Sequence, residues 1–364
     1  MLITTQNIPQ LTFTRFVAAS AVIVFHYGQS AFPFQSGFLH DLAKESGITV
    51  SYFFFLSGFL LYFVYSQKEF SARNFFAARA GRILPLYYLG FFLALFAVLV
   101  LRDVPPWRGS IVAQGLLIHA WIPGMSLTIN YPAWSVSVEA FFYLMFPLLL
   151  ILSRKISMRN FMLLAIVFWL LSIGQNMFVQ HLVYDPSSSK AGDFIMYFPP
   201  WHLNTFVSGI ASGMIFLSWR NKITTTGPVP LVLALVALAG LITFLVIENN
   251  PLRHLMHLGM LAPLYAMIVL GIALDRTIVS RVLSLKPMQF LGEISYGIYL
   301  LQFPVWAFME YATKNTGFDL ASTTGFYTCF SILLLVSALS YRFFESPLRV
   351  YIRGRFQKQK VEKV

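Results

Sequence analysis

The fold class of this chain is decided by Arg15-Phe-Val-Ala-Ala-Ser-Ala-Val-Ile-Val-Phe-His26, where two polar residues bound an apolar stretch. The stretch lies in a run from about residue 8 to residue 30 that is otherwise almost free of charge. Such a run is long enough to cross a bilayer as a helix. A central arginine there costs roughly 2.5–3.5 kcal/mol on insertion scales, so an intramembrane Arg or His is a functional candidate by default. The two side chains lie about 16 Å apart along a helix, at different depths.

The composition extends this interpretation to the whole chain. Of 364 residues, 57% are hydrophobic and only 11% are charged, whereas a soluble domain carries roughly 25% charged residues. The mean hydropathy is +0.69. We therefore predict a polytopic membrane protein and assign the net charge of +12 to basic cytoplasmic loops, with no nucleic acid as a partner. The single cysteine, Cys329, excludes an internal disulfide framework and a Cys-rich metal site, and no metal site is predicted.

The apolar runs predict an all-α bundle of about ten transmembrane helices. We place them at roughly 8–30, 47–66, 83–101, 134–152, 160–180, 197–219, 230–248, 255–274, 288–309 and 322–341. The stretch 111–122 is too short and too interrupted for a span, and is expected to be a re-entrant or interfacial helix. Residues 1–352 would form one transmembrane domain, followed by a basic cytoplasmic tail at 353–364.

Loop charges test this topology. If the N-terminus is cytoplasmic, the alternate loops on that side carry nineteen Lys and Arg residues and the opposite loops carry six. This bias predicts ten spans with both termini in the cytoplasm. The N-terminal segment lacks the charged n-region and cleavage site of a signal peptide, so the first apolar segment is expected to be retained.

A second intramembrane polar residue is a candidate partner for His26. Glu139 lies about five residues into the fourth predicted span, in Trp134-Ser-Val-Ser-Val-Glu139. Its predicted depth is similar to that of His26, and a buried glutamate must be paired or protonated. A carboxylate could orient the imidazole while the imidazole acts as general base on a hydroxyl. The alternative is that His26 is an interior polar residue satisfied by a neighbouring helix.

A cluster of arginines lies on the predicted cytoplasmic side. Arg79 and Arg82 are three residues apart and share a helix face. Together with Arg15, they could bind a phosphate bidentately. The alternative for Arg79 and Arg82 is ordinary interfacial anchoring, which explains Arg15 less well because it lies inside the apolar run.

Two further spans carry polar and glycine-rich stretches. Ser57-Gly58 in the second span, and Ser295 with Gly297 in the ninth, permit close helix contact. Tyr296, Tyr299 and Gln302 recur at helical spacing and could line a polar cavity. Glu345, in Phe343-Phe-Glu-Ser-Pro-Leu-Arg349, could pair with an arginine of the basic cluster or end a solvated helix.

These motifs resemble the acyltransferase family 3 membrane proteins, which O-acylate carbohydrates of bacterial envelopes. The resemblance covers nearly the whole chain. It rests on six motifs in order: Arg15-x10-His26, Phe53-Phe-Phe-Leu-Ser-Gly-Phe59, Arg79-x-x-Arg82, Trp134-Ser-Val-Ser-Val-Glu139, Ser295-Tyr-Gly-Ile-Tyr-Leu300 and Phe344-Glu-Ser-Pro347.

The resemblance implies a membrane O-acetyltransferase that moves an acetyl group from cytoplasmic acetyl-CoA, or another acyl-CoA, to a hydroxyl of a surface polysaccharide, an exopolysaccharide or a lipid-linked glycan. No permanently bound cofactor is expected. It implies His26 as catalytic base with Glu139 as partner, and Arg15, Arg79 and Arg82 at the donor. Residues expected to line the substrate cavity are Ser57, Trp134, Ser135, Ser137, Tyr296, Tyr299 and Gln302. Many relatives carry His at the position of Gln302, so no second imidazole is assigned there.

The resemblance also implies a multi-pass protein of the bacterial inner membrane, in contact with its lipids. Direct transfer to the acceptor and a transient acyl-His26 both remain open. The alternative function is a transporter or flippase for a lipid-linked sugar or small solute, in which Arg15, His26 and Glu139 would form a polar relay.

Overall fold

A computed structural model of the chain describes residues 8–183, 189–220, 222, 227–247, 250 and 252–358. These residues are predominantly helical and contain no strand. The long helices are α1 (Pro9–Ile23), α3 (Thr49–Tyr65), α4 (Ala72–Phe96), α6 (Trp134–Lys155), α7 (Met158–Val183), α9 (Leu203–Trp219), α10 (Val229–Val246), α12 (Ala262–Leu274), α14 (Lys286–Thr313), α15 (Thr323–Ser340) and α16 (Ser346–Lys358).

Shorter helices connect them: α2 (Gly37–Glu45), α5 (Arg108–Gly115), α8 (Ser189–Tyr197), α11 (Arg253–Leu255) and α13 (Ile278–Leu283). Five-residue π-helical segments are η1 (Val24–Gly28), η3 (Ala97–Leu101), η7 (Met256–Met260) and η8 (Tyr341–Glu345). Single 3₁₀ turns are η2 (Ser46–Ile48), η4 (His119–Trp121), η5 (Tyr131–Ala133) and η6 (Pro199–His202).

The predicted all-α membrane bundle is confirmed, with the count of ten as an approximation. Each predicted span contains a long helix, the eighth as the broken pair α11–α12. By length and apolar composition, seven helical stretches among the described residues can cross a membrane, or eight if that pair is one span. The helix α9 has 17 residues, at the lower end of the length range for a full crossing. The α5 helix has only 8 residues, so 111–122 is not a span. The chain is a multi-pass membrane protein.

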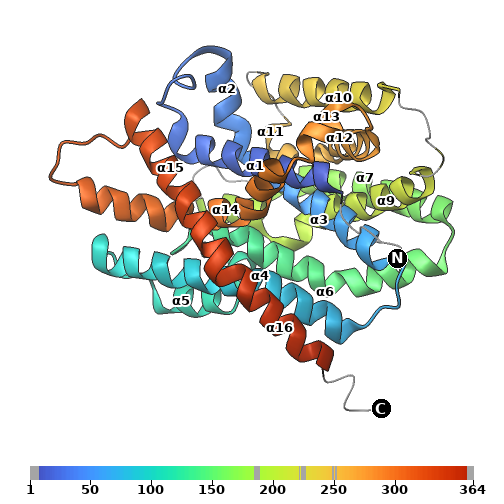
Figure 1. Cartoon of the computed structure of the whole chain (residues 1–364), viewed down its shortest axis with the longest axis horizontal. Coiled ribbons are helices and arrows are strands. Elements are labelled where there is room, and N and C mark those ends of the chain that lie inside the picture. The colour runs from blue at the N-terminus through green and yellow to red at the C-terminus, as the bar shows by residue number, and fades with distance from the viewer. Residues whose placement is uncertain are drawn as a thin grey trace.

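The C-terminal segment is helical beyond the last predicted span. After η8, the α16 helix extends to Lys358 and packs along α4, crossing the bundle diagonally in Figure 1. Residues 353–358 of the predicted basic tail belong to this helix, and residues 359–364 lie outside the described residues.

Helix α3 is at the centre of the bundle, and α7 and α10 are at its periphery. In the most apolar part of Gly37–Tyr65, the stretch that contains α3, 72% of the residues are buried. The corresponding share is 11% for Met158–His181 and 17% for Val229–Val246. The exposed side chains of α7 and α10 are mainly apolar, as expected for helices in contact with lipid tails.

Glycines allow the central helices to approach closely. A Cβ atom on Gly58 of α3 would lie 2.1 Å from the carbonyl oxygen of Phe206 in α9, and one on Gly209 of α9 would lie 2.1 Å from the carbonyl oxygen of Phe55. The backbones therefore touch where both helices lack a side chain. The predicted close contact at Gly58 is confirmed. Gly297 in α14 likewise faces Ser337 of α15, 3.0 Å from its Cβ.

Candidate functional site

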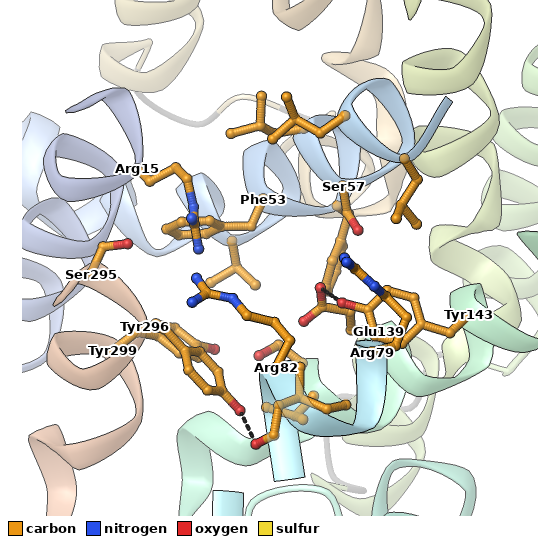
Figure 2. A pocket seen from close by; sticks show the side chains of 18 of the residues that line it. Arg15, Phe53, Ser57, Arg79, Arg82, Glu139, Tyr143, Ser295, Tyr296 and Tyr299 are labelled. Carbon is orange, nitrogen blue, oxygen red and sulfur yellow. Dashed lines mark hydrogen bonds between the residues drawn. The ribbon is translucent and has the colours of Figure 1, made fainter. Parts of the chain in front are cut away.

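A cavity of about 270 Å³ lies inside the bundle between α1, α3, α4, α6 and α14. We call it the inner cavity. Figure 2 shows its polar side chains converging from these five helices. Its polar and tyrosine lining consists of Arg15, Ser57, Tyr65, Arg79, Arg82, Ser135, Glu139, Tyr143, Ser295, Tyr296 and Tyr299.

Three guanidinium groups face this cavity. Arg79 and Arg82 lie on one face of α4, whose first turn is capped by the Ser71 hydroxyl accepting from the Asn74 N–H. The Arg79 guanidinium carbon lies 5.8 Å from the centre of the Tyr143 ring, and that of Arg82 lies 5.9 Å from the Tyr296 ring. Figure 2 shows the Arg15 and Arg82 guanidiniums pointing toward each other across the cavity.

Within the part of the chain that the structure describes, these three cations have no carboxylate partner at ion-pair distance. None of them takes part in the ion pairs found among the described residues. The Nε atom of Arg79 is buried and has no hydrogen-bond partner there. Three guanidiniums face the cavity together with the Glu139 carboxylate, and surplus positive charge inside a membrane domain is costly. The arrangement therefore favours an anionic ligand, and planar guanidiniums bind phosphate bidentately.

Among the described residues, Glu139 is the only carboxylate that lines the inner cavity. It accepts a hydrogen bond from the Tyr143 hydroxyl, one turn further along α6. Glu139 therefore belongs to the arginine cluster. The predicted pairing of Glu139 with His26 is not formed in this structure.

His26 lies in a second cavity of about 690 Å³, which we call the outer cavity. It is part of the π-helical segment η1, and π-helical turns occur often at functional sites. Its side chain is exposed, and its ring lies 4.7 Å from the Tyr131 ring, edge to face. The outer cavity is also lined by Arg102, Trp306 and Glu310.

Glu139 and His26 line different cavities. The predicted depth of Glu139 assumed that α6 begins at the membrane surface. In the structure, the segment before α6 contacts the first turns of this helix, where the Ser137 hydroxyl donates to the Leu117 carbonyl. Glu139 lies in the inner cavity, which it shares with Arg15.

The segment η5 contacts the walls of both cavities. The Tyr299 hydroxyl, from the inner cavity, donates to the Pro132 carbonyl at 2.9 Å. The Tyr131 hydroxyl donates at 2.6 Å to the hydroxyl of Tyr27, which lines the outer cavity.

The structure separates the predicted cavity residues into two groups. Ser57, Ser135, Tyr296 and Tyr299 line the inner cavity, whereas three others do not line it. The Trp134 ring packs against Phe54 and His202, Ser137 is bonded as described above, and Gln302 is buried and donates to the Tyr299 carbonyl. These three side chains are buried and line neither cavity.

Glu345, in the π-helical segment η8, is buried at 5% exposure. Neither of its carboxylate oxygens has a hydrogen-bond partner among the described residues. The cations that influence it most are Arg82 and Arg349. The alternative of a solvated helix end is therefore wrong, and the Glu345 carboxyl group lies beside the arginine cluster.

Sequence reasoning missed several residues of the two cavities. Tyr143 could have been found because it lies four residues after Glu139, on the same helix face. Arg102 and Glu310 form an ion pair at 2.6 Å, but they are 208 residues apart and no motif links them. Among the described residues, no group of three or more His, Cys, Asp or Glu side chains is arranged to hold a metal ion.

Comparison with known proteins identifies the family. The family model described as "Acyltransferase domain", acyltransferase 3, matches residues 8–342. The acyltransferase MdmB of Streptomyces mycarofaciens is 35% identical over 165 residues, 42% of each chain. The O-acetyltransferase OatA of Staphylococcus aureus (strain NCTC 8325 / PS 47) is 23% identical over 368 residues, 94% of this chain and 57% of that protein.

A putative O-acetyltransferase of Staphylococcus aureus (strain COL) is 22% identical over 374 residues, with the same coverage. The chain thus spans about half the length of the curated relatives it matches. No solved structure matches it. Because the family model covers nearly the whole helical bundle, including both cavities, the chain belongs to the acyltransferase 3 family of membrane proteins.

Proposed function

We propose that this chain is a membrane O-acetyltransferase that moves an acetyl group from acetyl-CoA to a hydroxyl of an envelope carbohydrate. The observation that carries the proposal is the convergence of Arg15, Arg79 and Arg82 on one cavity, whose lining among the described residues includes a single carboxylate, that of Glu139. The name O-acetyltransferase of the relative OatA supports acetyl as the group transferred.

The inner cavity is the proposed donor site. The phosphates of CoA carry negative charge that would offset the three guanidiniums, and Arg forms two parallel bonds to a phosphate. Glu139 and Tyr143 would orient Arg79 beside them. The nucleotide would remain at the arginines while the pantetheine arm carries the thioester toward His26, about 16 Å further along the first span.

His26 is the proposed general base, acting without Glu139. The imidazole takes the proton of the acceptor hydroxyl as its oxygen attacks the thioester carbonyl carbon. The C–S bond breaks, and the CoA sulfur leaves with the proton returned by the imidazolium. The products are the acetyl ester and CoA with a free thiol. An acetyl-His26 intermediate is the alternative route.

This scheme places the protein in the bacterial inner membrane with both termini in the cytoplasm. The arginine cavity would then face the cytoplasmic pool of acetyl-CoA, and His26 would face the outer side, where an envelope glycan or its lipid-linked precursor is present.

The first experiment is mass spectrometry of envelope and secreted carbohydrate from cells with the wild-type protein, without it, and with His26→Ala. Loss of the mass of one acetyl group per repeat in both deficient strains is the expected result. Unchanged glycan masses in all three strains would contradict the proposal.

Donor binding is tested separately by heating purified protein with acetyl-CoA. A ligand at a hundred times its Kd stabilises the native state by about 2.7 kcal/mol. A transporter of lipid-linked sugar has no reason to respond to acetyl-CoA, so this measurement also distinguishes the alternative function.

A further inference from the structure

The outer cavity is preformed by contacts between distant parts of the chain. Its lining includes the stretch 317–321, between α14 and α15. The Ser30 hydroxyl donates to the Ala321 carbonyl at 2.7 Å, and the Phe32 N–H donates to the Thr323 hydroxyl at 2.9 Å. At about 690 Å³, the cavity has the size of known small-molecule sites, roughly 300–1,000 Å³.

The charges of the outer cavity are balanced, unlike those of the inner cavity. Two cations, Arg102 and Lys314, line it together with two carboxylates, Glu310 and Asp319. Arg102 and Glu310 pair at 2.6 Å, and both side chains are accessible, at 44% and 62%. An anionic ligand would meet no surplus positive charge here, whereas hydroxyl groups can donate to the carboxylates and accept from the guanidinium.

Aromatic residues complete this lining beside the candidate base. The Trp306 ring stacks on the Tyr27 ring with centres 4.0 Å apart, and both residues line the cavity with His26. Rigid aromatic walls with a few fixed polar groups are typical of sites that orient a small ligand. A hydroxyl held here is within the same cavity as the imidazole.

We infer that the outer cavity is the acceptor-binding site and that it takes an uncharged, hydroxyl-rich acceptor such as a neutral sugar unit. Arg102, Glu310 and Trp306 are its binding residues. The inference rests on the proposed function, since it assigns the second substrate of that reaction to a place. The inner cavity is then a cationic donor site, and the outer cavity is a charge-balanced acceptor site.

The test blocks the outer cavity from outside. Ala321 is exposed and lines the cavity, so Ala321→Cys introduces a thiol with little change in volume. Right-side-out membrane vesicles loaded with radiolabelled acetyl-CoA are treated with a bulky, membrane-impermeant maleimide. Transfer of label to the endogenous carbohydrate is then measured. The single native cysteine, Cys329, is fully buried. The wild-type protein is therefore the control that does not react with the maleimide.

Thr324→Cys is the matched control, because Thr324 is exposed close by in the chain but does not line the cavity. We expect acetyl transfer by the maleimide-treated Ala321→Cys protein to fall at least tenfold. Transfer by the maleimide-treated Thr324→Cys protein should be unchanged. Protection by acetyl-CoA against heating should be unchanged in both. Full transfer by completely labelled Ala321→Cys, or failure of the reagent to reach it, would overturn the inference.

The acceptor class is tested on the product of the wild-type protein. Mass spectrometry of the acetylated unit should show a sugar without a carboxylate or phosphate, and an acidic acetylated sugar would overturn the charge argument. Failure of the proposed function is distinguishable, because untreated wild-type vesicles would then transfer no acetyl group at all.

Discussion

At the scale of single residues, His26 is defined by its exposure within a membrane helix. It lines the outer cavity and is edge-to-face with Tyr131. We predict that His26→Ala lowers acetyl transfer by about 10²–10⁴-fold, the usual contribution of a general base. Membrane abundance and thermal protection by acetyl-CoA should remain, because the arginines of the inner cavity are untouched. Transfer of radiolabelled acetyl groups in vesicles measures the activity, and a melting curve with acetyl-CoA measures the thermal protection.

His181→Ala is the control, since His181 is an exposed histidine at the end of α7. It should behave as wild type. Wild-type transfer by the His26→Ala protein would remove the base from the mechanism.

The arginines of the inner cavity predict a different kinetic signature. Arg82→Ala should raise the KM for acetyl-CoA by about 10- to 100-fold, because a hydrogen bond to a charged group contributes about 1.5–3 kcal/mol. Arg82→Lys should be intermediate, since it keeps the charge and loses the bidentate geometry. Initial rates at varied acetyl-CoA measure the effect.

Arg159→Ala tests whether positive charge alone is responsible. Arg159 is exposed at the start of α7 and does not line the cavity. Its replacement should leave the KM unchanged. An equal rise in KM for Arg159→Ala and Arg82→Ala would assign both residues to membrane anchoring.

At the scale of helices, the close backbone contact between α3 and α9 provides a test of the packing. Gly58→Ala would place a Cβ 2.1 Å from the Phe206 carbonyl oxygen, so the helices must separate. Overpacking of this kind costs about 1–3 kcal/mol. We predict a lower melting temperature and lower yield in detergent, by fluorescence-detected size exclusion. Gly174→Ala on α7, which meets nothing within 4 Å, should be neutral or slightly stabilising.

The segment between α5 and α6 carries a buried titratable group outside the membrane spans. His119 is fully buried, and burial lowers the pKa of His119 to about 4. Its unfolded pKa is about 6.5, so between these values the unfolded state binds more protons. Stability should therefore fall as pH drops from about 6.5 toward 4, by up to about 1.4 kcal/mol per pH unit from this group.

His119→Gln should reduce the slope of melting temperature against pH in that range, measured by thermal unfolding in detergent. An unchanged slope would show that His119 is protonated or exposed in the native protein.

At the scale of the whole molecule, the charge bias of the loops predicts the orientation. Asn315→Cys, between α14 and α15, should react with an impermeant maleimide on intact cells. Arg281→Cys, exposed on α13, should react only after the membrane is opened. Labelling of both from outside would show that the alternation of spans is wrong. The buried Cys329 keeps the background low.

The fold class and the approximate positions of the spans were predictable because both depend on local sequence. A run of apolar residues must satisfy its backbone hydrogen bonds internally in lipid, so it becomes a helix wherever it occurs. The arginine pair at 79 and 82 was predictable for the same reason, since helical spacing places both on one face. Gly58 was found because only a small residue permits backbone contact.

The membership of each cavity was decided by tertiary structure. Glu139 of α6 and Arg15 of α1 line one cavity only because these two helices pack around it. The pairing of Arg102 with Glu310 joins residues 208 positions apart, and no local pattern encodes it. Sequence by itself determined a helical membrane protein with basic and imidazole groups at different depths. Only the packing of the helices decided that Glu139 lies with the arginines and that His26 lies in a separate, charge-balanced cavity, because both results depend on long-range contacts.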